Sequence, residues 1–292
     1  MTPADGDLDD LLRRTSRTFA LAIPLLPDGL QREVGVSYLL LRIADTLEDA
    51  EHWQVERRVE ALAEFAEWLE RRDRESPVGG WLADPPSDDQ GYLDLLRQTP
   101  AVLQALDAIE PERRELIAQH AASTARGMSG YVSRGLAIRS VGELRAYCWV
   151  VAGSVGELLT GLFASWQPTV ARARHELSSL ASSFGEGLQL VNILKDSLTD
   201  ARAGRRFLPE GVERATVAEL ARLDLAAADR YVQALKKAGA ASGIVAFCTL
   251  PLRLAEATLD RLSTDGAGAK VSRQEVSRIL ERVLAETAPP SA

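Results

Sequence analysis

Apolar residues recur at intervals of three and four along almost the whole chain, which is the spacing of one face of an α-helix. No run of alternating apolar and polar residues is long enough to indicate a β-strand. Proline and glycine divide this pattern into segments of helix length, at residues 24–29, 76–92, 127–135 and 207–211 and at Pro111, Pro168 and Pro251. The sequence therefore predicts an all-α protein, with 76–92 as a loop.

One predicted helix carries acids where the pattern is otherwise apolar. It runs from about residue 30 to residue 72 with a break near Trp53, and it contains Asp45, Glu48 and Asp49 after a run of leucines. Positions i, i+3 and i+4 share one helix face, so we expect all three carboxylates to project together. They repel one another unless positive charge lies among them.

A second predicted helix, from about residue 170 to residue 202, repeats this feature. Asn192, Asp196 and Asp200 follow each other at intervals of four, and Gln189 falls near the same stripe. The apolar surroundings are supplied by Leu188, Val191, Ile193, Leu194 and Leu198. Three oxygen-bearing side chains are thus predicted to line one face.

Either cluster alone is explained by solvation or by pairing with nearby Lys or Arg. Two such clusters favour another interpretation, because carboxylate and amide oxygens are ligands that Mg²⁺ prefers, and Mg²⁺ often completes its shell with phosphate oxygens. Basic residues accompany both clusters and can neutralise a departing diphosphate: Arg17, Arg42, Lys195, Arg205 and Arg206. Together they indicate ionisation of an allylic diphosphate to a carbocation.

Bulk composition changes this picture little. The 292 residues are 46% hydrophobic, without repeats or a linker-like composition shift, so we expect one domain over residues 1–285 and a disordered tail over 286–292. A net charge of −8 argues against nucleic acid as a partner. Cys148 and Cys248 lie in apolar segments without metal-site spacing, which predicts buried thiols in a reducing compartment. The first ten residues lack the pattern of a signal peptide.

Residues 147–166 approach the length of a membrane span and contain one charge, Glu157. Three glycines, the central acid and the lack of flanking basic residues favour a buried core helix. We therefore predict no transmembrane helix.

Five stretches of the chain together resemble the squalene/phytoene synthase family, which condenses isoprenoid diphosphates head to head. They occur in the family's order and cover most of the chain: residues 16–27 (SRTFALAIPLLP), 38–49, 147–163, 187–209 and 247–259. The resemblance implies an all-helical isoprenoid-synthase fold, a single domain around a central apolar cavity. It also implies that the two acidic helices face each other across the mouth of that cavity.

The resemblance assigns roles to individual residues. Mg²⁺ would be bound by Asp45, Asp49, Asn192, Asp196 and Asp200. The N-terminal segment that contacts diphosphate would be Ser16, Arg17, Thr18 and Phe19, and further diphosphate contacts would come from Arg42, Gln189, Lys195 and Arg205.

Tyr147 matches the family's tyrosine beside the cationic intermediates, and Phe247 matches an aromatic residue near the late carbocation. The Tyr147 ring can stabilise a cation and its hydroxyl can steer a proton, while core packing is the alternative for both rings. The small residues Ala152, Gly153, Ser154 and Gly156 would leave room for a prenyl chain or permit close helix packing, and the two are compatible.

The sequence departs from the family pattern at two positions. Thr199 stands where an acid usually precedes Asp200, and Lys195 stands where arginine is common, which keeps the charge without the bidentate fork. Neither change removes an expected metal ligand.

The resemblance most favours a squalene synthase, which joins two farnesyl diphosphates through presqualene diphosphate and reduces the product with NADPH. Lys270 and Arg273 could contact the nucleotide phosphates, or they could simply be solvated. The alternatives are synthases of phytoene, dehydrosqualene or hydroxysqualene, a class I terpene cyclase, and a non-catalytic assembly factor. The lipophilic product implies transient membrane contact by an otherwise cytoplasmic protein, and the oligomeric state is left open.

Overall fold

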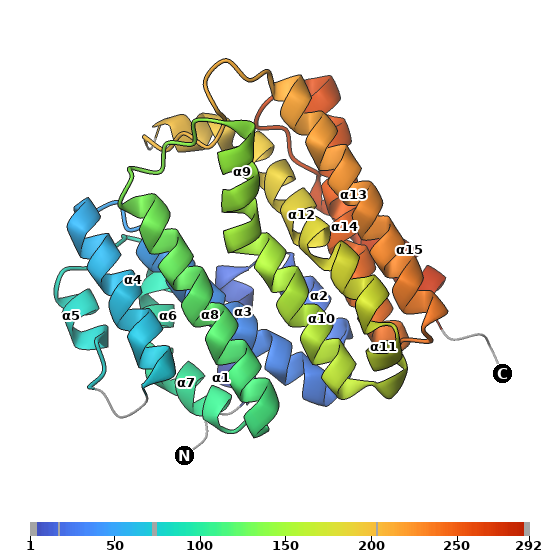
Figure 1. Cartoon of the computed structure of the whole chain (residues 1–292), viewed down its shortest axis with the longest axis horizontal. Helices are drawn as coiled ribbons and strands as arrows, with labels where there is room; N and C mark the ends of the chain where they lie inside the picture. The colour runs from blue at the N-terminus through green and yellow to red at the C-terminus, as the bar shows by residue number, and fades with distance from the viewer. Residues whose placement is uncertain (1–4, 17, 72–74, 203, 289–292) are drawn as a thin grey trace. The chain divides into compact units, whose positions relative to one another are not determined.

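The computed structural model describes residues 5–16, 18–71, 75–202 and 204–288 (Figure 1). Within these ranges the backbone forms no strand, and an isolated parallel bridge joins Ala137 to Arg206. The all-α prediction is confirmed. The helices are α1 (Asp5–Thr15), α2 (Phe19–Ala22), η1 (Ile23–Leu25), α3 (Asp28–Glu48), α4 (Val55–Glu70), α5 (Val78–Ala83), α6 (Gln90–Arg97), α7 (Thr99–Asp107), α8 (Pro111–Val132), α9 (Val141–Cys148), η2 (Trp149–Gly153), α10 (Ser154–Trp166), α11 (Pro168–Arg172), α12 (Arg174–Arg202), α13 (Arg214–Lys237), α14 (Ser242–Asp265) and α15 (Arg273–Thr287).

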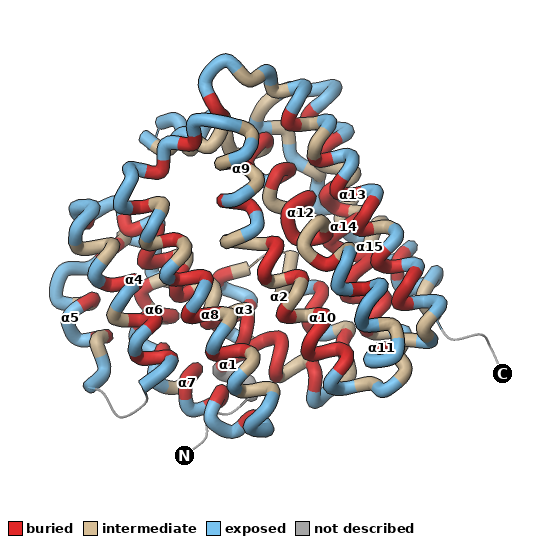
Figure 2. Tube along the Cα trace, in the orientation of Figure 1, coloured by how far each residue is buried: buried red, intermediate tan, exposed pale blue. Residues whose placement is uncertain are grey.

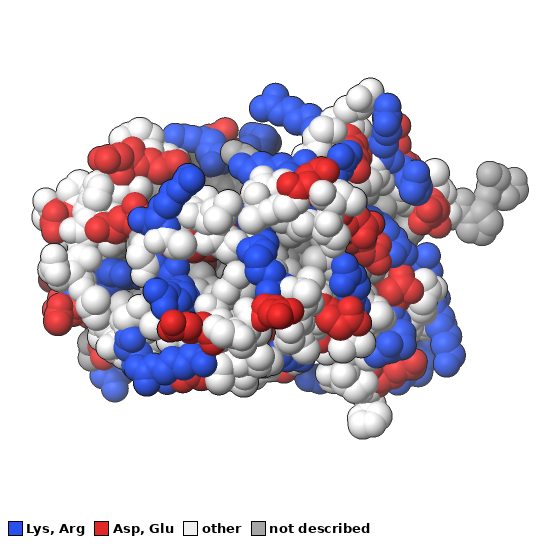
Figure 3. Space-filling view, turned by 90° about the horizontal axis from the view of Figure 1, so that it is seen from above, with Lys and Arg blue, Asp and Glu red and all other residues white. Residues whose placement is uncertain are grey.

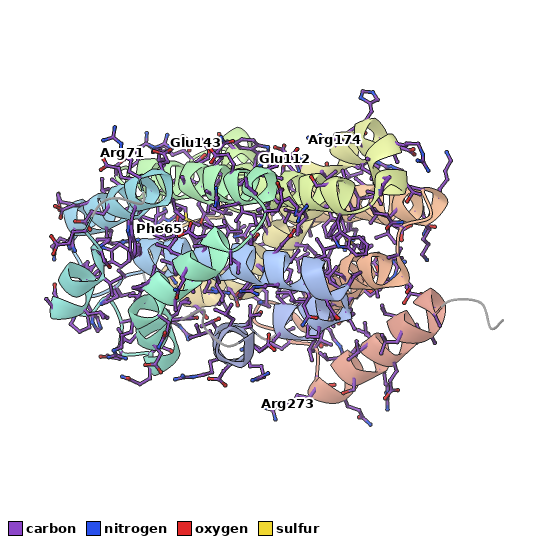
Figure 4. The ribbon with its side chains drawn as sticks, turned by 90° about the horizontal axis from the view of Figure 1, so that it is seen from below. Phe65, Arg71, Glu112, Glu143, Arg174 and Arg273 are labelled. Carbon is purple, nitrogen blue, oxygen red and sulfur yellow. The ribbon has the colours of Figure 1, made fainter. Side chains whose placement is uncertain are left out.

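The chain divides into two compact units, each described here by itself. The first comprises Met1–Ile23 and Asp28–Leu136. Its long helix α3 packs against α8, α4, α7, α1 and α6, and α4 packs along α8. Leucines of α3 are buried in this unit (Figure 2), and Phe65 lies among side chains between its helices (Figure 4). The packing holds the first acidic motif on the central helix of this unit.

The second unit comprises Pro24–Pro27 and Ala137–Ala292. Helix α12 packs along α13 and against α10, η2 and α14, and α14 in turn packs against α13 and α15. Phe163 and Phe247 meet edge to face in this core, with ring centroids 6.1 Å apart. The second acidic motif therefore lies on the helix with the most extensive packing in its unit.

Close helix packing in the second unit depends on glycine. A Cβ added at Gly185 of α12 would lie 1.9 Å from the carbonyl oxygen of Ala152, and one added at Gly156 of α10 would lie 2.0 Å from that of Ala181. The turn before α10, Trp149–Gly153, is π-helical and follows Tyr147 and Cys148. The small residues over 152–156 thus serve close packing, the second of the two expectations stated for them.

Several predicted boundaries are confirmed and others are wrong. The break near Trp53 is present, since α3 ends at Glu48 and α4 begins at Val55. Residues 76–92 are not simply a loop: they contain α5, where Trp81 is fully buried and donates from Nε1 to Glu64 at 2.7 Å. The glycines after residue 126 do not interrupt α8, and Pro251 lies inside α14, because packing of these long helices outweighs local preference.

In the second unit the structure also differs from the prediction in where helices begin and end near residues 170 and 286. The predicted helix from residue 170 is two helices, α11 and α12. Residues 286 and 287, which we expected in the tail, belong to α15, and residues 289–292 lie outside the described ranges. The single domain over 1–285 stays a prediction.

Two stretches in the described part of the chain are long and apolar enough to cross a membrane by length and composition, Val141–Trp166 and Ser242–Asp265. Half of the most apolar window of the first and 67% of that of the second are buried inside the structure. Core helices pass the same test. Glu157 accepts hydrogen bonds from Trp149 Nε1 at 3.1 Å and from Ser182 Oγ at 2.6 Å, and this polar anchoring favours the predicted core helix.

The two cysteines are free thiols and both are buried, as predicted. Burial raises the pKa of each thiol. We expect Ellman's reagent at pH 8 to label neither cysteine in the native protein and both after unfolding in guanidinium chloride. Native labelling as fast as labelling of the unfolded chain would contradict this burial.

Candidate functional site

The first acidic motif ends α3, and its three acids do not share one environment. Asp45 is half-buried and Asp49 is exposed, whereas Glu48 is only 3% exposed. The expectation that all three carboxylates project together is therefore wrong for Glu48. The buried face of α3 is wide enough to include the position of Glu48, which lies next to the core residue Leu47.

Arg42 links Asp45 to an aromatic neighbour that the sequence analysis did not single out. Its Nη1 donates to Asp45 Oδ2 at 2.6 Å, and its Nε and Nη2 donate to the Tyr38 hydroxyl at 3.2 Å and 2.9 Å. Burial acts to lower the pKa of Arg42, but Asp45 and Tyr38 outweigh it, so the net pKa is raised and the guanidinium stays charged. The motif thus contains a fixed positive charge beside its first aspartate.

The N-terminal segment reaches the same place through Tyr38. The Phe19 ring lies 5.3 Å from the Tyr38 ring, and the backbone N–H of Phe19 donates to Ser16 Oγ at 3.0 Å. Thr18 stands at the N-cap position of α2 without a side-chain capping bond, and Arg17 lies outside the described residues. Ser16 and Phe19 therefore lie close together, and the Phe19 ring meets the tyrosine that Arg42 contacts. The diphosphate contacts of these residues stay a prediction.

Tyr92 of α6 is a further residue of this region that the sequence analysis missed. Burial raises its pKa, Arg42 lowers it, and Asp45, Asp89 and Asp49 raise it again. Its hydroxyl therefore lies within electrostatic range of the motif. Nothing in the local pattern around residue 92 indicates this, because α6 reaches α3 only through tertiary packing.

The second acidic motif lies along α12. The Lys195 ammonium is 3.1 Å from Asn192 Oδ1 and 3.2 Å from Asp196 Oδ2, so it bridges two of the predicted metal ligands. Asn192 is exposed and the Asp196 side chain is 46% exposed. Leu198, one of the apolar neighbours of the motif, is 52% exposed. The motif faces solvent along much of its length.

Asp200 ends the stripe in a more enclosed place. Burial raises its pKa, while Arg205, whose Nη2 donates to Asp200 Oδ1 at 3.2 Å, acts to lower it. The backbone N–H of Arg205 also donates to the Asp200 carbonyl at 2.9 Å, so the chain turns back on the motif. Arg206 instead pairs with the exposed Glu210 at 3.5 Å. Of the two arginines expected here, Arg205 joins the motif.

Tyr147, at the end of α9, is buried and stacks on Phe207, with ring centroids 5.0 Å apart and an interplanar angle of 26°. Phe207 follows the turn after the second motif, so this stack brings Tyr147 to the same end of the unit. Phe247 instead packs against Phe163 in the core, which supports its packing alternative. The carbocation roles of Tyr147 and Phe247 stay predictions.

Lys270 and Arg273 are both exposed at the start of α15, and Figure 4 shows Arg273 projecting away from the ribbon. Figure 3 shows Lys and Arg side chains interspersed with Asp and Glu on the face it draws. On that face an anion would meet individually placed basic residues rather than an extended basic patch. A nucleotide role for Lys270 and Arg273 stays a prediction.

No group of three or more His, Cys, Asp or Glu in the described ranges is arranged to hold a metal ion. The donor chemistry nevertheless fits Mg²⁺, because each motif offers partly exposed carboxylates and α12 adds an amide oxygen. Mg²⁺ commonly binds through one or two carboxylates and completes its shell with water and phosphate oxygens.

A cluster absent from our predictions joins three helices of the second unit. Arg145 of α9 pairs with Glu186 of α12 at 3.1 Å and with Asp224 of α13. Burial raises the pKa of both carboxyls, and Arg145 acts to lower both. The sequence alone gave no signal, since the three residues lie on separate helices and none shares a motif.

We expect Arg145→Met to destabilise the protein by about 2 kcal/mol at pH 7, because it leaves two buried carboxyls without their guanidinium. Their pKa values would rise further above those of the unfolded chain, so the unfolded state would lose protons first as the pH increases. The loss relative to wild type should therefore grow from pH 5 to pH 8. Urea unfolding at several pH values measures it, and a pH-independent difference would contradict the explanation.

Comparisons with known proteins agree on the fold and the family. The model of the squalene/phytoene synthase family matches residues 12–280. Squalene synthase BSS of Botryococcus braunii is 32% identical over 207 residues, which are 70% of this chain and 42% of that protein. Squalene synthase of Schizosaccharomyces pombe is 29% identical over 210 residues, 69% of this chain and 43% of that protein. The chain spans less than half the length of these curated relatives.

Solved structures show the same architecture. TcSQS in complex with the ligand E5700 superposes with a TM-score of 0.73 at 23% identity, covering 97% of this chain and 88% of that one. A dehydrosqualene synthase in complex with a ligand gives 0.65 at 18% identity, covering 96% and 95%. The protein therefore has the all-helical isoprenoid-synthase fold. With the family model matching most of its length, the chain belongs to the squalene/phytoene synthase family.

Proposed function

We propose that the protein is a Mg²⁺-dependent prenyltransferase that condenses two farnesyl diphosphates head to head, by way of presqualene diphosphate, to squalene with NADPH as reductant. The observation that carries this proposal is the stripe of Asn192, Asp196 and Asp200 along α12, with Lys195 and Arg205 held beside it. Membership of the family and the similarity to relatives named as squalene synthases, such as squalene synthase BSS, support it.

The proposed residues would have two roles, binding of metal and binding of diphosphate, according to their chemistry. Asp45, Asp49, Asn192, Asp196 and Asp200 would bind Mg²⁺, which neutralises the diphosphate and favours its departure. The basic residues would bind the outer oxygens of the diphosphate through charge-assisted hydrogen bonds: Arg42, Lys195 and Arg205. Gln189 and the segment from Ser16 to Phe19 would complete that contact.

Tyr147 and Phe207 present two stacked rings at the end of α9. A π face can stabilise a carbocation once diphosphate has left, and the Tyr147 hydroxyl can hold or accept a proton. In the first condensation the carbon that loses diphosphate and a proton forms two carbon–carbon bonds, one to each carbon of a double bond in the second substrate, so that a cyclopropane ring closes and the π bond is consumed. We propose that Tyr147 acts beside that cation and that Phe247 lies near the late carbocation.

Residues 1–285 would act as one catalytic domain, and Lys270 with Arg273 would contact the nucleotide. Because squalene is lipophilic, we propose transient contact of a cytoplasmic protein with a membrane surface when product leaves.

Incubation of the purified protein with farnesyl or geranylgeranyl diphosphate and Mg²⁺, with and without NADPH, tests the proposal when the products are identified by mass spectrometry. Squalene that requires NADPH is the expected result. Dehydrosqualene or phytoene would indicate proton loss as the last step, and hydroxysqualene would indicate water capture. Absence of any diphosphate release would overturn the enzymatic proposal and favour a non-catalytic family member.

A further inference from the structure

Three of the aspartates proposed to bind Mg²⁺ form ion pairs with basic side chains. In each case the partner is a basic side chain close in sequence, and the pairs are Arg42–Asp45 at 2.6 Å, Lys195–Asp196 at 3.2 Å and Arg205–Asp200 at 3.2 Å. The same arrangement thus recurs in both motifs, although they lie on different helices and in different units.

Lys195 shows the arrangement most clearly. Its ammonium lies 3.1 Å from Asn192 Oδ1 and 3.2 Å from Asp196 Oδ2, which places a positive charge between two of the oxygens that would bind the metal. Mg²⁺ requires ligand oxygens at about 2.0–2.1 Å. A divalent ion and an ammonium cannot share that space without strong repulsion, because Coulomb energy rises as separation falls. Metal binding to Asn192 and Asp196 therefore requires Lys195 to move.

Moving Lys195 away from Asn192 and Asp196 requires little free energy. The side chains of Lys195 and Asp196 are 28% and 46% exposed, and exposed ion pairs change an equilibrium by about fivefold at most. Lysine is also a flexible four-carbon stem that carries a point charge, without the fixed fork of arginine. Lysine at this position can leave one partner and reach another without a change in the helix.

We propose that Lys195 is a built-in counter-ion, which Mg²⁺ displaces from Asn192 and Asp196 and which then pairs with the diphosphate of the substrate. Arg42 and Arg205 are placed to act in the same way on Asp45 and Asp200. This inference rests on the proposed function. The exchange couples the binding of Mg²⁺ to the binding of diphosphate, because a metal ion that releases Lys195 makes a positive charge available to the diphosphate. By linkage, bound diphosphate then increases the affinity for Mg²⁺ to the same extent.

Metal binding without diphosphate tests the first half. Mn²⁺ is the probe, and the free ion is measured by electron paramagnetic resonance with wild type, Lys195→Gln, Lys195→Arg and Arg202→Gln. Arg202, on the last turn of the same helix, is exposed and gives the same change of net charge. Lys195→Gln should bind Mn²⁺ about three- to fivefold more tightly than wild type, and Arg202→Gln less than twofold, because only Lys195 occupies the site. Lys195→Arg should stay close to wild type.

A second titration uses inorganic diphosphate at saturating Mn²⁺. Here Lys195→Gln should weaken binding by about tenfold, since a charge-assisted hydrogen bond is lost. One substitution that tightens the metal and weakens the anion is the signature of a shared counter-ion, and a purely structural role for Lys195 would not produce opposite effects.

The outcomes distinguish failure of the counter-ion exchange from failure of the proposed metal site. Equal Mn²⁺ affinity of Lys195→Gln and Arg202→Gln would overturn the exchange while leaving the metal site intact. Unchanged diphosphate binding in Lys195→Gln would overturn the transfer of Lys195 to the substrate. If wild type binds no Mn²⁺, the metal site of the proposed function fails and the exchange fails with it.

Discussion

Replacing Asp196 with asparagine should lower the rate of diphosphate release from farnesyl diphosphate by at least about 10³-fold, because a metal ligand supplies several kcal/mol of charge stabilisation in the transition state. Asp45→Asn should have an effect of the same order. Both carboxylates are partly exposed, so the fold should survive either change.

The measurement is phosphate release in the presence of pyrophosphatase, with circular dichroism to confirm folding. Glu176→Gln is the matched control, since Glu176 is an exposed acid in the first turn of the same helix as Asp196. It should retain wild-type activity. A folded Asp196→Asn variant with activity within tenfold of wild type would contradict the metal-binding role.

The largest effect on stability is expected at Gly185. The alanine methyl group would lie 1.9 Å from the carbonyl oxygen of Ala152, so α12 and the π-helical turn would have to separate along a contact made by two backbones. Neither backbone can rotate away as a side chain could. We expect Gly185→Ala to cost about 3 kcal/mol or more of unfolding free energy, and Gly156→Ala a similar amount.

Gly130→Ala is the control for this prediction. Gly130 lies within α8 with no atom inside 4 Å of an added Cβ, so the substitution should be neutral or stabilise by about 0.5–1 kcal/mol through helix propensity. Guanidinium unfolding curves of the three variants provide the comparison. Gly185→Ala and Gly130→Ala with equal stability would show that the two helices can move apart freely.

The features that depend on local spacing were the ones that could be predicted from the sequence. The stripe from Asn192 to Asp200 and the break near Trp53 follow from periodicity and helix-ending signals, and the structure contains both. A local pattern does not reveal how wide the buried face of a helix is. For this reason Glu48 was grouped with Asp45 and Asp49, although it is buried.

Contacts between residues distant in sequence could not be predicted in this way. The Tyr38 ring contacts Phe19, 19 positions earlier in the chain. Arg145 forms ion pairs with Glu186 and Asp224, and the three residues lie on three different helices. The glycines and prolines around Trp81 gave no sign of a helix, yet its buried ring and its hydrogen bond to Glu64 anchor a short one. Tertiary packing decided each of these cases.

The π-helical turn Trp149–Gly153 separates the stacked Tyr147 ring from the Gly156 crossing on what is otherwise continuous helix. A π turn accommodates one additional residue, which rotates everything after it by roughly 100° relative to an uninterrupted α-helix. The turn therefore fixes the direction of the Tyr147 ring relative to the Gly156 crossing. An uninterrupted α-helix over the same residues would present Tyr147 and Gly156 in a different relative direction, so the π turn is part of how one segment serves both the stack on Phe207 and the crossing at Ala181.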